Sequence, residues 1–428
     1  MNSCTTYWGL LGTDGIGFLR RSRTLEIGSV VRKFNNLAVP GMGNVRFGKQ
    51  IYLAALGLAV AEKARTEKQK VKNIEMANAI EAIACLLSFQ HSNWKKDPRL
   101  KGSNKLKGVT DLSFSKVRKP GFYITQPMRM GTVQALPALG LVNADIIRFN
   151  SFQLTAEGRM LVNQISGQYP KIYRHYNIVD FLALWTKNSN LIGGFKHNDT
   201  LRLLLSPLEK LAPANRNLLK NFIYNQNNAD SAGRCKAMLT WMDMDYLQNR
   251  GHLSWSTKPS CIDDAHWKDL KAGACFFKVR SMALGLLDEL EKNISRKNAG
   301  AVGLKQATQH MKSKQTELSK AAQAFLQSEY DPSPERQATV FCSECMDIDN
   351  CIRTLVERDG VGLKLKGEMV IPGPGFKGTV LADKDQFDDD GDISFEEHKI
   401  KLPDCISTRV YNMFYLNQDL KGTINKWL

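Results

Sequence analysis

The stretch FQLTAEGRML, residues 152–161, carries the clearest local signal in the chain. Thr155 is a good N-cap because its hydroxyl can accept a free backbone N–H from the first turn of a helix. Glu157 places negative charge in that first turn, where the helix dipole favours it. The apolar residues that follow recur at helical spacing: Leu161, Val162 and Ile165. The pattern predicts a short strand, a cap and a helix, in that order.

The sequence just before this stretch predicts the other elements of a small domain. Residues 129–145, RMGTVQALPALGLVNAD, are helical in pattern as far as Gly140, a natural C-cap. Pro137 lies inside this predicted helix, where it removes a hydrogen bond and bends the axis. Residues 146–155, IIRFNSFQLT, are predicted to form two short strands with a hairpin turn at 150–151.

The order of helix, Leu-Gly-Leu-Val turn, hairpin and Leu-Thr-x-x-Gly helix start resembles the C-terminal half of a winged helix-turn-helix DNA-binding domain. The resemblance covers residues 129–165 within a predicted domain of 109–167. The residues in the expected places are Gly140, Leu141, Val142, Leu154, Thr155 and Gly158. Such domains place a recognition helix, here residues 129–139, in the DNA major groove and touch the backbone with the wing. The alternative is a winged-helix fold used only for protein contacts.

This resemblance implies a set of DNA-contacting residues. The candidates for base or phosphate contacts in the helix are Arg129, Thr132 and Gln134, and Arg148 would contact the backbone from the wing. Basic residues upstream would add affinity that does not depend on base sequence: Lys116, Arg118 and Lys119.

The charge of the chain is concentrated in its first third. The formal net charge is +17, and residues 1–130 hold 22 Lys and Arg against 8 Asp and Glu, so this third alone carries +14. Such asymmetry favours a polyanionic partner, and nucleic acid is the commonest one. The longest apolar run, residues 51–61, is about half of the ~20 residues that a membrane-spanning helix needs. Nine unevenly spaced cysteines fit a reducing cytoplasm better than a disulfide framework.

We expect a mainly α, multidomain protein with a winged-helix-like segment in the first half and a small β-rich C-terminal region. The strongest helix patterns span 47–68, 73–89, 264–294 and 304–327, and the first two are expected to be amphipathic. Alternating residues punctuated by Gly and Pro after residue 360 predict strands. The predicted regions are a basic helical region 1–108, the winged-helix-like domain 109–167, a helical domain 168–335 and a Cys-containing region 336–428.

A cysteine cluster gives a second functional signal. The segment FCSECMDIDNC, residues 341–351, spaces Cys342, Cys345 and Cys351 as C-x2-C-x5-C, and a CxxC turn can aim both sulfurs at one metal. The CxxC spacing alone suits a tetrahedral metal such as zinc. The whole triplet resembles that of iron–sulfur nucleases of the RecB type, and this resemblance implies an iron–sulfur cluster. The alternative is an ordinary helix with buried cysteines. The fourth ligand is open among Cys275, Cys261, Cys235, Cys405 and His252.

The remaining motifs favour a binding protein over an enzyme. Residues 386–397, QFDDDGDISFEE, partly match a calcium loop but are predicted to form an exposed acidic loop. No catalytic His, Ser or P-loop motif is present. We therefore expect a DNA-binding, non-catalytic component of a larger bacterial assembly with protein partners. A phage-defence or mobile-element system is the expected context, although no residue specifies it. A metal-containing nuclease, or another nucleic-acid-processing enzyme, is the alternative.

Overall fold

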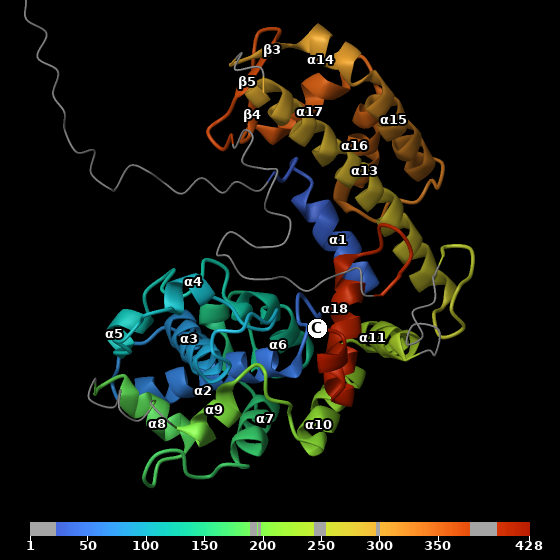
Figure 1. Ribbon diagram of the computed structural model, residues 1–428. Coiled ribbons are helices and arrows are strands. Elements are labelled where there is room, and N and C mark those ends of the chain that lie inside the picture. Colours follow the sequence, from blue (N-terminus) through green and yellow to red (C-terminus); the bar gives the residue numbers. More distant parts are fainter. Residues whose placement is uncertain (1–22, 189–194, 196–197, 244–253, 297–299, 377–399) are drawn as a thin grey trace, which may run out of the picture. The chain divides into compact units, whose positions relative to one another are not determined.

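A computed structural model shows that the protein is mainly helical, which confirms the predicted fold class (Figure 1). The described residues are 23–188, 195, 198–243, 254–296, 300–376 and 400–428. The chain divides into two compact units: the first holds residues 1–32 and 275–383, and the second holds residues 33–274 and 384–428. Each unit therefore joins segments that are far apart in the sequence. No described helix is long and apolar enough to cross a membrane.

Two adjacent helices, α2 (Gly48–Thr66) and α3 (Asn73–His91), form the centre of the second unit. They approach closely at Gly57, where a Cβ would lie 2.8 Å from the Cα of Ala77. The sequence predicts both helices close to these bounds but gives each a single apolar face. That part of the prediction is wrong, because both helices are buried around most of their circumference. Neighbouring helices cover them, so even their polar side chains must find partners inside the protein.

Shorter helices surround this pair within the second unit. They are α4 (Ser103–Leu106), α5 (Phe114–Val117), α7 (Ala156–Ser166), α8 (Ile178–Trp185), α9 (Asp199–Leu205), α10 (Pro213–Tyr224), α11 (Ala229–Met242) and α18 (Thr408–Lys421). The last helix belongs to the core, since most of its residues are buried. The ring of Phe414, itself 0% exposed, lies with its centroid 4.8 Å from that of Trp427. Asp419 also accepts a 2.8 Å hydrogen bond from the backbone N–H of Gly48 and so caps the start of α2.

Residues 142–154 contain a two-stranded sheet whose pairing differs from the prediction. Strand β1 (Val142–Asn143) pairs antiparallel with β2 (Gln153–Leu154), and the intervening wing loop, residues 144–152, contains the 3-10 helix η3 (Phe149–Ser151). The predicted hairpin turn at 150–151 is therefore wrong. The physical reason is that the Asn73 side chain of α3 takes up the loop's carbonyls, so they cannot join a strand ladder. Those carbonyls belong to Phe149, Asn150 and Phe152.

The residues on either side of this sheet confirm two local predictions and correct a third. The Thr155 hydroxyl accepts a 3.0 Å hydrogen bond from the Gly158 N–H and caps α7, and Gly140 has the left-handed φ of +68° that a C-cap requires. The single helix predicted over 129–139 is instead a 3-10 helix, η2 (Met128–Thr132), followed by the one-turn helix α6 (Ala135–Ala138). Pro137 has no backbone N–H, so it cannot make the hydrogen bond that one continuous helix over 129–139 would need at this position. This missing bond accounts for the interruption between η2 and α6.

The first unit combines helices with a three-stranded sheet. Its elements are the C-terminal part of α13 (Asp264–Arg296), α14 (Leu304–His310), α15 (Lys312–Leu326), α16 (Gln337–Met346), α17 (Cys351–Asp359), β3 (Val302–Gly303), β4 (Leu363–Lys366) and β5 (Met369–Pro372). The antiparallel order is β3–β5–β4. Strands β4 and β5 confirm the first part of the strand pattern predicted after residue 360, and the rest of that pattern, from residue 377, lies outside the described residues. Helices α16 and α17 precede these strands in the chain. The Arg23 guanidinium ties this unit together through three carboxylates: those of Asp288, Glu291 and Asp359.

Substituting Gly158 tests the junction between the wing and α7. A Cβ at this position would lie 2.1 Å from the backbone carbonyl oxygen of Leu141, a contact that only backbone movement can relieve. We expect Gly158→Ala to lower the free energy of unfolding by about 2–3 kcal/mol, measured in urea. The control is Gly233→Ala in α11, where nothing lies within 4 Å of the new Cβ. The control should raise stability by about 0.5–1 kcal/mol, and equal effects of the two changes would contradict the proposed close contact.

Candidate nucleic-acid interface

A groove of about 730 Å³ in the second unit brings together residues from the start of α3, the η2 turn, the wing loop and the start of α18. We call it the arginine groove. The residues that carry its chemistry are Arg129, Met130, Gln134, Ile147, Arg148 and Arg409. No described Asp or Glu lines it. Three of the residues predicted to bind DNA therefore meet at one place, together with an arginine that the sequence does not suggest.

Arg129 is fixed in the wall of this groove by α3 and by the wing. Its Nε donates a 2.6 Å hydrogen bond to the Asn78 side chain, and its guanidinium lies 5.4 Å from the centroid of the Phe149 ring. These two contacts orient the guanidinium. Among the described residues, no carboxylate lies within hydrogen-bonding distance of it. Burial lowers the pKa of Arg129, while the charge of nearby Glu81 raises it. The group keeps its charge because the pKa of arginine starts far above neutrality.

A buried carboxyl lies beneath Arg129. The Oε2 of Glu81 accepts a 2.5 Å hydrogen bond from the Tyr123 hydroxyl, and the Glu81 side chain is fully buried. Burial raises the pKa of Glu81 to about 7, against the opposing effects of the Tyr123 hydrogen bond and the Arg129 charge. This carboxyl therefore changes its charge near neutral pH. It also accepts from the backbone of Met128 and Arg129 and so supports the η2 turn from inside the protein.

Arg409, from the first turn of α18, is the residue that sequence reasoning missed. Its Nη2 donates a 2.7 Å hydrogen bond to Gln134, and its Nη1 donates to the Asn36 side chain and the Val39 carbonyl. The side chain is only 7% exposed, and burial lowers its pKa to about 10. No carboxylate pairs with it among the described residues. Nothing in the sequence links residue 409 to residue 134, so only the fold could reveal this site.

The wing loop contributes Arg148 to the groove. Arg148 is exposed, and no described side chain pairs with its guanidinium. Its backbone is held firmly, since the Arg148 N–H donates to the Ile146 carbonyl at 2.7 Å and the Ser151 hydroxyl donates to the carbonyls of both residues. The loop is therefore positioned by the protein, while the charged end of Arg148 is left in solvent.

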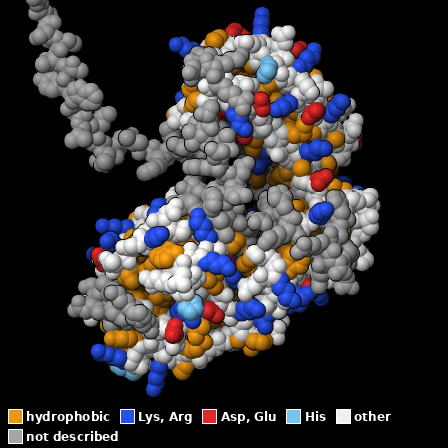
Figure 2. Space-filling view, in the orientation of Figure 1, with side chains coloured by type: hydrophobic (Ala, Val, Ile, Leu, Met, Phe, Trp, Pro, Cys, Tyr) orange, Lys and Arg blue, Asp and Glu red, His pale blue; other side chains and the backbone are white. Residues whose placement is uncertain are grey.

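The other predicted DNA contacts have different positions. Thr132 is 0% exposed and its hydroxyl donates to the Arg129 carbonyl, so it has no surface to offer DNA. Lys119 is exposed. The Nζ of Lys116 lies 3.8 Å from Oδ2 of Asp111. The Nη2 of Arg118 lies 3.4 Å from Oε1 of Glu75. Glu75 follows a groove residue, Ile74, in α3, so Arg118 lies towards the same end of that helix. Figure 2 shows Lys and Arg side chains spread over the visible face of this unit, with apolar patches between them.

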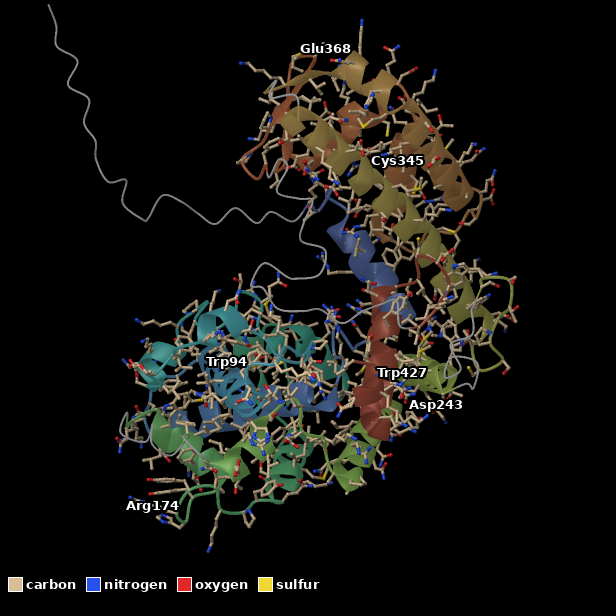
Figure 3. All side chains as sticks on the ribbon, in the orientation of Figure 1. Trp94, Arg174, Asp243, Cys345, Glu368 and Trp427 are labelled. Atoms are coloured by element: carbon tan, nitrogen blue, oxygen red, sulfur yellow. The ribbon has the colours of Figure 1, made fainter. Side chains whose placement is uncertain are left out.

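The cysteines predicted as metal ligands lie in the first unit and are packed in its helices. Cys342, Cys345 and Cys351 are buried, and Cys345 lies among the helices of this unit (Figure 3). Burial raises the pKa of Cys342 and Cys351 to about 12 and that of Cys345 further. Cys275, half-buried, is close enough to Cys342 to raise its pKa. The described residues contain no group of three or more His, Cys, Asp or Glu placed to hold a metal.

The zinc or iron–sulfur prediction therefore rests on spacing alone, and the packing of these thiols resembles that of small apolar core residues. The calcium-like segment 386–397 lies outside the described residues. Comparison with protein-family models, curated proteins and solved structures finds no match to this chain. The geometry of the arginine groove is consequently the basis for assigning a function.

The ionisation of Glu81 predicts a pH dependence of stability. Its pKa in the folded protein, about 7, lies above the ordinary value of 4.5, so folding favours the protonated form. The stabilisation of the folded protein by protonated Glu81 is complete below pH 4.5 and is lost as the pH rises through 7. Glu81→Gln mimics the protonated form at every pH. Relative to wild type, the variant should gain on the order of 3 kcal/mol between pH 4.5 and pH 8, measured by urea unfolding. If the difference in unfolding free energy between Glu81→Gln and wild type stays constant from pH 4.5 to pH 8, the raised pKa of Glu81 is contradicted.

The role of Cys345 can be tested by Cys345→Ser. If the thiol is a packed core residue, a hydroxyl at this apolar site should lower the free energy of unfolding by about 1–2 kcal/mol. Metal content, measured in protein purified without air, should be the same in the variant and in wild type. The control is Cys405→Ser, since Cys405 is exposed, and it should leave stability nearly unchanged. An equivalent of zinc or iron in the wild type that is lost from Cys345→Ser would instead establish a metal site.

Proposed function

We propose that this protein binds duplex DNA through the arginine groove and the adjoining wing loop. The observation that carries the proposal is the convergence of Arg129, Arg148 and Arg409 on one groove that no described carboxylate lines. Arginine is well suited to phosphate because its planar guanidinium can donate two parallel hydrogen bonds. Three such groups in one groove match the repeated negative charge of a nucleic-acid backbone.

Arg409 gives the proposal its strongest energetic support. A buried charge is normally compensated by an opposite charge, because removing an ion from water is costly. Arg409 is buried and hydrogen-bonded to neutral partners, Asn36, Val39 and Gln134. A phosphate in the groove would supply the missing negative charge and lower the cost of burying the guanidinium.

The distribution of charge supports the same partner over a wider surface. The first third of the chain carries +14 of the net +17, and it provides the groove residue Arg129 as well as Lys116, Arg118 and Lys119. Long-range attraction from this region would speed association with DNA and hold it without regard to base sequence. The short η2 and α6 turns and the buried Thr132 favour backbone binding by the wing and the groove over base reading by a long recognition helix.

The wider prediction of a non-catalytic subunit in a larger bacterial assembly belongs to this proposal. An accessory DNA-binding chain needs a basic surface and exposed apolar residues, and the second unit has both. The described residues add no observation in favour of a metal-containing nuclease.

Binding of a generic fluorescent duplex, followed by anisotropy at increasing salt, tests the proposal. Affinity should fall steeply with salt, with a slope of about −0.9 for each phosphate contacted. Arg148→Ala should reduce the size of this slope by about 1 and weaken binding roughly tenfold near physiological salt. Arg148 is suitable because it is exposed, so its removal should leave the fold intact.

Arg174→Ala is the matched control, since Arg174 is exposed, belongs to the same unit and does not line the groove (Figure 3). It removes the same charge and should change the slope much less. Two results would overturn the proposal: no binding of wild type at low salt, or identical losses for Arg148→Ala and Arg174→Ala.

A further inference from the structure

The wing loop exposes apolar side chains beside the arginine groove. Among the large hydrophobic residues of the described chain, Ile146 is 58% exposed, Ile147 is 64% exposed and Met130 is 43% exposed. Met130 and Ile147 line the groove itself, and Ile146 adjoins Ile147 in the loop. Exposed apolar residues are ordinary when scattered singly, but a cluster on one site indicates a binding surface.

This apolar tip is held in place by hydrogen bonds rather than by packing of the isoleucines. The Ser151 hydroxyl donates to the Ile146 carbonyl at 2.6 Å, and Asn73 donates to carbonyls in the second half of the loop. Phe149 and Phe152 are buried and anchor the loop to the core. The protein therefore fixes the backbone while leaving both isoleucines in water, an arrangement that favours insertion into a partner.

We propose that Ile146 and Ile147 act as a wedge that inserts between base pairs of the duplex held by the arginine groove. This inference rests on the proposed function. Apolar side chains that enter the minor groove partly unstack a base step and kink the duplex. The wing would therefore bend DNA at the point where Arg148 and Arg129 hold its backbone, and the bend would bring more phosphates towards the basic surface.

The charges around the tip favour DNA over an apolar protein surface. Ile147 lies in a groove with three arginines, and the groove has no described carboxylate. Asp145, also exposed, is the one carboxylate of the wing loop. Isoleucine side chains cannot recognise bases by hydrogen bonds, so the wedge would prefer steps that unstack easily, such as TA and CA, to any fixed sequence.

The wedge can be tested with duplexes that carry 2-aminopurine at a TA step, since this base fluoresces more strongly when it is unstacked. Wild-type protein should raise the fluorescence and bring fluorophores at the two duplex ends closer together. The double variant Ile146→Ser, Ile147→Ser should lose both signals, bind about tenfold more weakly and keep the wild-type salt slope, because its phosphate contacts remain. Met160→Ser is the control, since Met160 is also exposed but lies in α7 outside the groove; it should behave as wild type.

The outcomes separate this inference from the proposed function. If wild type binds DNA with a steep salt slope but changes neither fluorescence nor end-to-end distance, the wedge is overturned and DNA binding stands. If wild type binds no DNA at low salt, both fail. Binding to vesicles containing phosphatidylserine that is stronger than binding to DNA, and lost in the double variant, would overturn the wedge in favour of membrane insertion. Urea unfolding of the double variant should match wild type, since both isoleucines are exposed.

Discussion

The buried polar side chains of α3 are the constraint on which the candidate site depends. Because this helix is covered by neighbours, Asn73, Asn78 and Glu81 must be satisfied inside the protein, and an unpaired polar group there would cost on the order of 1–3 kcal/mol. Several of their partners belong to the site. Asn73 donates to carbonyls of the wing loop, and Asn78 accepts from Arg129, while Glu81 accepts from the Tyr123 hydroxyl behind the groove. A helix of the core thus positions both Arg129 and the wing loop.

The arginine groove concentrates positive charge, and no described carboxylate lines it, although the buried Glu81 acts on Arg129 from behind. Arg129 is oriented by an amide and an aromatic ring, and Arg409 by amides and a carbonyl, so neither is held in an ion pair at hydrogen-bonding distance among the described residues. The first unit shows the opposite arrangement, in which Arg23 is surrounded by three carboxylates. Arginine thus occurs in two settings in one chain: Arg23 is paired with carboxylates that fix the packing, whereas Arg129 and Arg409 are hydrogen-bonded to neutral groups.

Several elements of the fold could be predicted because their causes are local. The bounds of α2, α3 and α13 follow from continuous helical stretches, although the single apolar face expected of α2 and α3 does not hold. The Thr155 cap and the Gly140 turn follow from single residues, and strands β4 and β5 follow from alternation between glycines. One error arose where a distant group contributes to the structure: the turn predicted at 150–151 is instead part of a loop whose carbonyls accept from Asn73. Another error is local, since the helix predicted over 304–327 is divided at Met311 into α14 and α15.

The sequence by itself determined which residues could contact DNA from one short segment, because Arg129, Gln134 and Arg148 lie within a recognisable local pattern. Only the tertiary structure decided which of them share a site. It buried Thr132, brought Arg409 from the far end of the chain to Gln134, and left Ile146 and Ile147 exposed beside them. Local patterns report the conformation of neighbouring residues along the chain. Burial and the meeting of distant side chains depend instead on which helices cover one another, and that is settled only when the whole core packs.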